Sequence, residues 1–198
     1  MLTPIVAKCT SSSKLTGARV APWRRATYHP TMEIRRRVSV ERNRLHFAAA
    51  HMATFAGECE PLHGHNYQII VELEGELDDD SWVWDFSDLK RATKAIADEL
   101  DHRFLLQKES RVLTIEEGED SWQVTFRERS FQFPKSDVAV LPIDNTTAER
   151  LAEWVGNRLW DYLRPQARAA LRGLTVGIEE MPGQAGWYSI MAEPRVLS

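Results

Sequence analysis

The apolar residues of the chain change their spacing several times, and each change predicts a different element. Apolar and polar residues alternate over 33–40, and they alternate again with the opposite parity over 45–51. Alternation with a period of two predicts strands with one buried face, and the parity change predicts a bulge or bend near Arg42 to Arg44. A third alternating run covers about 65–76. These runs predict an antiparallel pair of strands.

Two later stretches carry apolar residues at helical spacing instead. They cover 89–100 and 151–159, and the second follows Thr146 and Glu149, which have the spacing of a capping box. Strands return over 174–180 and 186–191. This order predicts an α+β domain in which an antiparallel sheet carries two antiparallel helices on one face. Between the helices, about 107–137 contains three short alternating runs, which predict an inserted hairpin.

Composition limits the classes of protein that this chain can belong to. Its 198 residues are 43% hydrophobic without a membrane-length apolar run, which fits one domain and no membrane span. The first 31 residues hold five Lys or Arg and no acid, so the remainder has 20 basic and 29 acidic residues, a net charge of −9. An acidic body excludes a typical nucleic-acid binder. Two cysteines give no disulfide framework and favour a reducing, cytoplasmic compartment.

The N-terminal segment, residues 1–31, is rich in Ser, Pro and Arg and lacks periodicity. We expect it to be disordered. Its composition is similar to that of a transit peptide, but four Pro or Gly residues interrupt any amphipathic helix. A start codon assigned too far upstream, with Met32 as the true start, explains it better. The folded domain is therefore expected to cover 32–198.

The densest chemistry lies in the stretch HMATFAGECEPLHGHNY, residues 51–67. His63 and His65 point to the same side of an extended segment, and a hairpin would bring His51 to them. His46 has the wrong strand parity to join them. Three neutral imidazoles suit zinc, and a three-ligand site leaves a position for substrate or water, as in catalytic zinc sites.

Several other residues are candidates for chemistry. Cys59 lies four residues before His63 and is flanked by acids, which argues for an exposed turn. Asp101 and His102 end the first predicted helix, where such a pair by itself more often forms a helix-terminal hydrogen bond. Glu180 ends an apolar strand face, and its neighbour Glu179 faces the other way. A carboxylate there can accept two parallel hydrogen bonds from a planar ligand.

Six motifs in the same order give the chain a specific resemblance to the 6-pyruvoyl-tetrahydropterin synthase and 6-carboxytetrahydropterin synthase family, over about residues 32–189. They are Phe47-x-Ala49-Ala50-His51 with Cys59-x-x-x-His63-Gly64-His65-Asn66-Tyr67, Asp85-Phe86-x-x-Leu89-Lys90, Leu100-Asp101-His102, Thr147-x-Glu149, Val176-x-Ile178-x-Glu180, and Tyr188-Ser189. The inserted segment departs from the family pattern, in which that connection is usually short.

The resemblance implies a tunnelling fold whose subunits join their sheets into a barrel, as a homo-oligomer, with a hexamer as the family expectation. It implies a pterin site at a subunit boundary. Zinc would be held by the three metal ligands His51, His63 and His65 and would act as a Lewis acid. The resemblance further assigns the role of general base to Cys59 and that of proton carrier to His102, oriented by Asp101. It assigns the binding of the pterin ring to Glu180 and additional pterin contacts to Thr146 and Thr147.

The spacing of Cys59 resembles that of the 6-carboxytetrahydropterin synthase branch, which serves queuosine and other deazapurines. The implied reaction converts 7,8-dihydroneopterin triphosphate to 6-carboxy-5,6,7,8-tetrahydropterin, with release of acetaldehyde and triphosphate. Glu60 is an alternative base, because it resembles the glutamate of relatives that make a 6-hydroxymethyl pterin for folate. A pyruvoyl synthase, a dual-activity enzyme and a non-catalytic pterin-binding protein remain alternatives. A zinc hydrolase is disfavoured because no Glu has the usual metalloprotease spacing.

Overall fold

A seven-stranded sheet runs through the part of the chain that this computed structural model describes, residues 34–41 and 45–192. The order is β10-β6-β2-β5-β11-β12, and β1 also pairs with β5. The strands are β1 (Arg37–Val40), β2 (His46–His51), β5 (His63–Gly75), β6 (Arg103–Gln107), β10 (Val138–Leu141), β11 (Leu171–Met181) and β12 (Gln184–Met191). The expected disorder of 1–31 lies outside the described residues.

The predicted parity change between the first two strands is visible in the register of their common partner. Val40 pairs with Val71, and His46 pairs with Gln68. The sequence therefore advances six residues from Val40 to His46, whereas the partner strand β5 advances only three. The surplus of three residues lets Val40 and then Leu45 be buried despite their opposite parity. The bulge expected at 42–44 itself lies outside the described residues.

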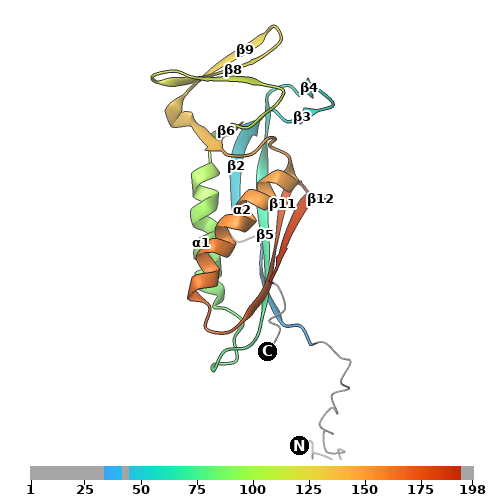
Figure 1. The fold of residues 1–198 in the computed structure, drawn as a ribbon, viewed down its shortest axis with the longest axis vertical. Helices are drawn as coiled ribbons and strands as arrows, with labels where there is room; N and C mark the ends of the chain where they lie inside the picture. The colour runs from blue at the N-terminus through green and yellow to red at the C-terminus, as the bar shows by residue number, and fades with distance from the viewer. Residues whose placement is uncertain (1–33, 42–44, 193–198) are drawn as a thin grey trace, which may run out of the picture. The chain divides into compact units, whose positions relative to one another are not determined.

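Two helices cover one face of the sheet and run in opposite directions (Figure 1), as predicted. They are α1 (Phe86–Leu100) and α2 (Ala148–Leu163), with short 3-10 turns at Lys135–Asp137 and Arg164–Gln166. The expected capping box is wrong by one position, because Thr147, and not Thr146, accepts from the Arg150 N–H as the N-cap. Thr146 is fully buried, and its hydroxyl donates to Gln107 instead.

Not every pairing in the sheet is antiparallel, which differs from the prediction. β6 pairs parallel with both β2 and β10. Helix α1 leads the chain back along the sheet, and β6 continues in the same direction (Figure 1). The parallel pair β6 and β10 needs a long crossover connection, which the inserted segment between them supplies.

The inserted segment is a three-stranded antiparallel sheet, which confirms the predicted hairpin and its continuation. Its strands are β7 (Thr114–Glu117), β8 (Ser121–Phe126) and β9 (Arg129–Pro134). A small hairpin of β3 (Thr54–Phe55) and β4 (Glu58–Cys59) belongs to the loop between β2 and β5. Together with β6 and β10, the insert and this loop form a second buried cluster made of Met52, Cys59, Phe104, Leu106, Leu113, Trp122, Val124 and Val138.

Glycine allows the start of α2 to lie directly on β12. A Cβ at Gly186 would come within 2.4 Å of the Glu149 backbone nitrogen and 2.6 Å of the Ala148 carbonyl carbon. Because backbone cannot yield to such a clash, only glycine fits here. This contact places the first turn of α2 beside the β11–β12 hairpin. Among the described residues, none of the helices is long and apolar enough to cross a membrane.

Candidate metal centre and active site

The three predicted histidine ligands come together at one end of the sheet. His51 ends β2 and lies directly opposite His63, the first residue of β5. His65 follows two residues later on the same face. One ring nitrogen of each residue lies within 4.8 Å of the others, whereas His46 is exposed on the other face of β2. Strand parity therefore builds the cluster that the sequence predicts.

The hydrogen bonds of the imidazoles leave the ring nitrogens that face one another free to bind a metal. The Nδ1 of His51 lies 2.9 Å from the Thr146 carbonyl oxygen, and the Nδ1 of His63 lies 2.8 Å from the Pro61 carbonyl oxygen. Because a carbonyl only accepts, each Nδ1 carries the proton and each Nε2 presents a lone pair. Burial lowers the pKa of His51 to about 4, so this ring is neutral at pH 7.

The distance between the two facing nitrogens fits a metal ion. The Nε2 atoms of His51 and His63 are 3.2 Å apart. Two tetrahedral zinc ligands with Zn–N bonds of about 2.0–2.1 Å would be separated by roughly 3.3 Å. Two acceptor nitrogens at this distance gain nothing from each other, whereas a cation between them would bind both. The residues present therefore fit a metal, and imidazole ligands suit zinc, copper, iron or nickel.

A buried polar network behind His51 fixes its ring. The Thr146 hydroxyl lies 3.2 Å from His51 Nδ1 and donates to Gln107 Oε1 at 3.1 Å, while Gln107 Nε2 donates to the Met52 carbonyl. His51 is 2% exposed, and Thr146 and Gln107 are 0% exposed. Carbonyl partners of this kind orient metal-binding histidines. The carbonyl and hydroxyl of Thr146 thus meet His51 and Gln107, and the expected contact of Thr146 with a pterin stays a prediction.

Sequence reasoning missed Gln107, although one signal was present. It is the polar end of the strand RFLLQ, whose last four residues are all buried. A buried amide needs partners because an unpaired polar group in the interior is costly. Gln107 finds them in Met52 and Thr146.

A cavity of about 390 Å³ adjoins the histidines. The side chains that give it chemical character are His51, His63, Glu60, Thr147, Glu149 and Glu180. Three carboxylates thus face two imidazoles and the start of α2. Such an arrangement can hold a cation, accept protons and bind a ligand rich in N–H donors.

Glu180 occupies the position predicted from strand parity. It is half-buried at the cavity, and burial raises the pKa of its carboxyl group, against the opposing effect of His65. Among the described residues, none donates a hydrogen bond to its carboxylate. Glu179 faces the other way and accepts the Gly183 N–H at 2.8 Å. Glu180 is therefore free to accept hydrogen bonds from a ligand, and Glu179 is not in the cavity.

The structure places the two candidate bases differently from the expectation. Glu60 lines the cavity, with its Oε2 atom 3.8 Å from His63 Nε2. Cys59 is 8% exposed and packs in the second buried cluster, beside Trp122 and Val124 of the inserted sheet. Burial raises the pKa of its thiol. Neighbouring residues of an extended segment face opposite sides, so burying Cys59 turns Glu60 toward the metal cluster.

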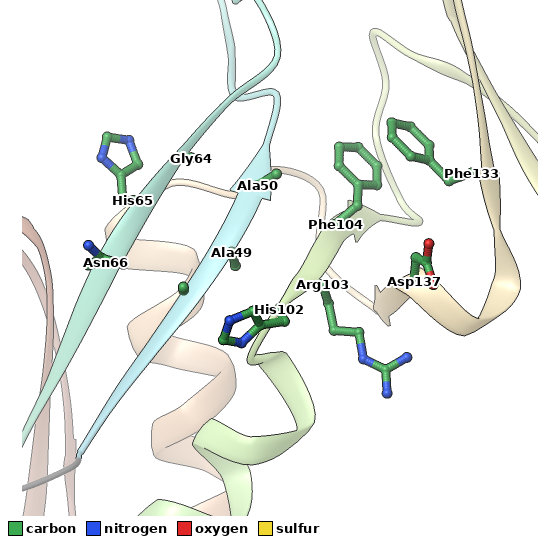
Figure 2. Close-up of a pocket in the computed structure, with 11 residues that line it drawn as sticks. Ala49, Ala50, Gly64, His65, Asn66, His102, Arg103, Phe104, Phe133 and Asp137 are labelled. Atoms are coloured by element: carbon green, nitrogen blue, oxygen red, sulfur yellow. The ribbon is translucent and has the colours of Figure 1, made fainter.

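Asp101 and His102 form the predicted pair, but they lie at another cavity. Asp101 Oδ2 is 3.0 Å from His102 Nδ1, and Asp101 Oδ1 accepts the Ala48 N–H at 2.8 Å. The His102 side chain is 83% exposed and borders a cavity of about 540 Å³ that His65 also borders. Figure 2 shows His102 beyond β2, on the side away from β5. One chain therefore does not bring His102 to the cavity of His51, His63 and Glu60.

Comparisons with known proteins agree on one family. The family model described as 6-pyruvoyl tetrahydropterin synthase matches residues 40–190. A putative 6-carboxy-5,6,7,8-tetrahydropterin synthase of Methanocaldococcus jannaschii is 34% identical over 145 residues, which are 73% of this chain and 89% of that protein. A dihydroneopterin monophosphate aldolase of Pyrococcus furiosus is 44% identical over 62 residues, which are 31% of this chain and 53% of that protein.

A solved structure also has the same fold. The 6-pyruvoyltetrahydropterin synthase of Plasmodium vivax, in a variant with a catalytic glutamate replaced by alanine, superposes with a TM-score of 0.74. Its sequence is 29% identical, and the match covers 81% of this chain and 100% of that one. The part of this chain that the family model matches, residues 40–190, includes both helices and all three histidines.

Proposed function

Because the chain belongs to the 6-pyruvoyl tetrahydropterin synthase family, we propose that it is a metal-dependent lyase that shortens the side chain of 7,8-dihydroneopterin triphosphate. The proposed products are 6-carboxy-5,6,7,8-tetrahydropterin, acetaldehyde and triphosphate, with net consumption of one water. One observation supports this proposal above the others: His51 and His63 of the histidine cluster share a cavity with Glu60 and Glu180. The names of the curated relatives support the carboxylated product.

The metal would be held by His51, His63 and His65, and we propose zinc. When bound, zinc supplies a Lewis acid that polarises oxygen atoms of the substrate side chain. The hydrogen bonds of the His51 and His63 Nδ1 atoms to the Thr146 and Pro61 carbonyls turn the Nε2 atoms of both rings toward the metal position.

The protein's own residues would bind the pterin ring and move protons. Glu180 would accept two parallel hydrogen bonds from the amino group and the neighbouring ring N–H of the pterin. Glu60 is close enough to His63 to take a proton from the side chain of a substrate in the cavity. Cys59, the base that the resemblance assigns, would have to leave its buried cluster to act.

A second candidate product follows from the position of Glu60. If the carboxylate acts as the base, cleavage of the bond between the first and second side-chain carbons would give a 6-hydroxymethyl dihydropterin for folate synthesis. The other two carbons would leave as glycolaldehyde triphosphate. The catalytic glutamate of the Plasmodium vivax protein and the name of the Pyrococcus furiosus aldolase support this alternative. A dual-activity enzyme would use Cys59 for one product and Glu60 for the other.

We further propose a homo-oligomer, hexameric by family resemblance, in which the Asp101–His102 pair serves the cavity of a neighbouring subunit. The exposure of His102 and its separation from the His51 and Glu60 cavity within one chain support this arrangement. A cytoplasmic role in queuosine or another deazapurine pathway completes the proposal.

Product analysis of three proteins tests the proposal. Purified wild type, Cys59→Ala and Glu60→Ala would each be loaded with zinc, incubated with dihydroneopterin triphosphate and analysed by mass spectrometry. We expect the wild type to form the carboxylated pterin, Cys59→Ala to lose it, and Glu60→Ala to lose any hydroxymethyl product. Unchanged substrate with the zinc-loaded wild type would contradict the proposed function.

A further inference from the structure

The inserted sheet holds the segment that carries both candidate bases, and Arg129 makes the decisive contacts. We propose that Arg129 is a positioning residue that keeps Glu60 facing the metal cavity and Cys59 buried, and that it thereby sets the ratio of the two pterin products. This inference rests on the proposed function, which it extends from the site to the control of its specificity.

One guanidinium binds two successive backbone carbonyls of the base segment. Arg129, the first residue of β9, donates from Nη2 to the Cys59 carbonyl at 2.5 Å and from Nη1 to the Glu60 carbonyl at 3.1 Å. A planar fork with two donors fixes both the position and the rotation of the backbone that it binds. On the other side, the Glu60 N–H donates to the Ala53 carbonyl at 2.9 Å. Glu60 is therefore held by its backbone from two sides.

The hydrogen bonds to the backbone determine the directions of the Cys59 and Glu60 side chains. Because successive residues of an extended segment face opposite sides, only one of Cys59 and Glu60 faces the cavity at a time. A rotation of the segment would exchange them, as a one-residue slip exchanges the faces of a strand. The inserted sheet favours the observed arrangement in two ways. Its residues Trp122 and Val124 belong to the apolar cluster that includes Cys59, and its Arg129 holds the carbonyls.

The guanidinium of Arg129 is itself supported. The Cζ atom of Arg129 lies 5.1 Å from the centroid of the Phe126 ring, which is a cation–π distance. Arg127 lies over the same ring, at 4.8 Å, but pairs with the exposed Glu58 side chain and not with the backbone. The two arginines share one hairpin, one charge and one aromatic ring. Arg127 is therefore a matched control for Arg129.

The test compares Arg129→Met and Arg129→Lys with Arg127→Met in the full chain, in a Cys9→Ser background so that Cys59 is the only thiol. The first measurement is the rate at which Cys59 reacts with Ellman's reagent, taken from its pH dependence for the fully ionised thiol, because Arg129 also lowers the pKa of Cys59. This rate reports the exposure of the thiol without depending on activity. The second is the ratio of carboxylated to hydroxymethyl pterin formed from dihydroneopterin triphosphate by the zinc-loaded proteins. Melting temperatures identify any variant that fails to fold.

We expect Arg129→Met to raise the labelling rate of Cys59 by about tenfold or more, because lost charge-assisted hydrogen bonds make local opening more frequent. Its product ratio should shift toward the carboxylated pterin as Cys59 gains access to the cavity. Arg129→Lys, which keeps the charge but not the fork, should lie between, and Arg127→Met should match the background protein.

Either of two results would overturn the inference: an unchanged labelling rate in Arg129→Met, or faster labelling with an unchanged product ratio. If Arg129→Met does not fold, the milder Arg129→Lys decides by the same two measurements. A background protein that forms no pterin product would contradict the proposed function instead. In that case the labelling rate alone decides whether Arg129 holds the segment.

Discussion

Replacing Glu180 by glutamine is the sharpest test of how this cavity binds a pterin. The substitution keeps the size of the side chain but removes the negative charge, and it turns one acceptor oxygen into a donor. Its neighbour Glu179 provides the control, because it lies on the other face of the same strand and accepts the Gly183 N–H. Two adjacent residues of one type thus occupy opposite faces, and only Glu180 lines the cavity.

The expected magnitude follows from the surroundings of Glu180. Two charge-assisted hydrogen bonds to a pterin would contribute about 1.5–3 kcal/mol each if fully formed and shielded. Glu180 is only half-buried, and glutamine can still accept one of the two hydrogen bonds, so the loss should be smaller than the full sum. We expect Glu180→Gln to weaken pterin binding by roughly 2–4 kcal/mol, which is about 30- to 900-fold in Kd.

Binding would be measured by titrating the metal-free variants with 7,8-dihydroneopterin and following its fluorescence, and KM would be measured with the zinc-loaded enzymes. Glu179→Gln should change Kd less than about twofold, as a surface substitution does. The melting temperature of Glu180→Gln should not fall, since none of the described residues donates a hydrogen bond to the Glu180 carboxylate. Equal losses of affinity in the two variants would refute the parity argument, and no loss in either would refute the carboxylate anchor.

Three further predictions concern the metal and the assembly. Elemental analysis should find about one zinc per chain in the wild type and almost none in His63→Ala, with an unchanged circular dichroism spectrum because both helices and the sheet have their own core. Thr146→Val removes the hydroxyl 3.2 Å from His51 Nδ1 but keeps the carbonyl that accepts from it, so zinc affinity should fall by about tenfold at most. Thr147→Ala should cost about 1 kcal/mol of unfolding free energy and leave zinc bound. Co-expressed His63→Ala and His102→Ala chains should recover activity that neither variant has alone; mixed oligomers as inactive as the separate variants would contradict a shared site.

The parts of the fold that depend on strand parity could be predicted from the sequence. His51, His63 and His65 share one parity on paired strands, and the structure places them together. The same reasoning separates Glu180 from Glu179 correctly. Such predictions succeed because a period of two leaves only two faces, and the apolar residues of each strand identify the buried one.

The predictions that failed concern residues whose environment comes from distant segments. Flanking acids suggested that Cys59 is exposed, but Trp122 and Val124, more than 60 residues later, supply an apolar cluster for it. Thr146 has the spacing of a capping box, yet its partners are His51 and Gln107. Local spacing does not reveal which distant group competes for a hydroxyl or covers a thiol, because tertiary contacts outweigh local preference.

The backbone at His102 gives a physical reason to regard this exposed residue as part of a site. Its φ of +56° is a left-handed conformation, which costs a non-glycine residue about 1–2 kcal/mol. The neighbouring strand β2 maintains it: the Ala48 carbonyl accepts the His102 N–H at 2.6 Å, and the Ala48 N–H donates to Asp101. Asp101 in turn lies 3.0 Å from His102 Nδ1. His102 is thus held in a costly backbone conformation, with its ring oriented by a carboxylate and its other nitrogen directed at no described residue. These features support the proposal that it acts on a group supplied by another subunit. A second subunit that presents a metal-held substrate would meet this requirement, and for this reason the mixed-oligomer experiment tests the assembly and the chemistry together.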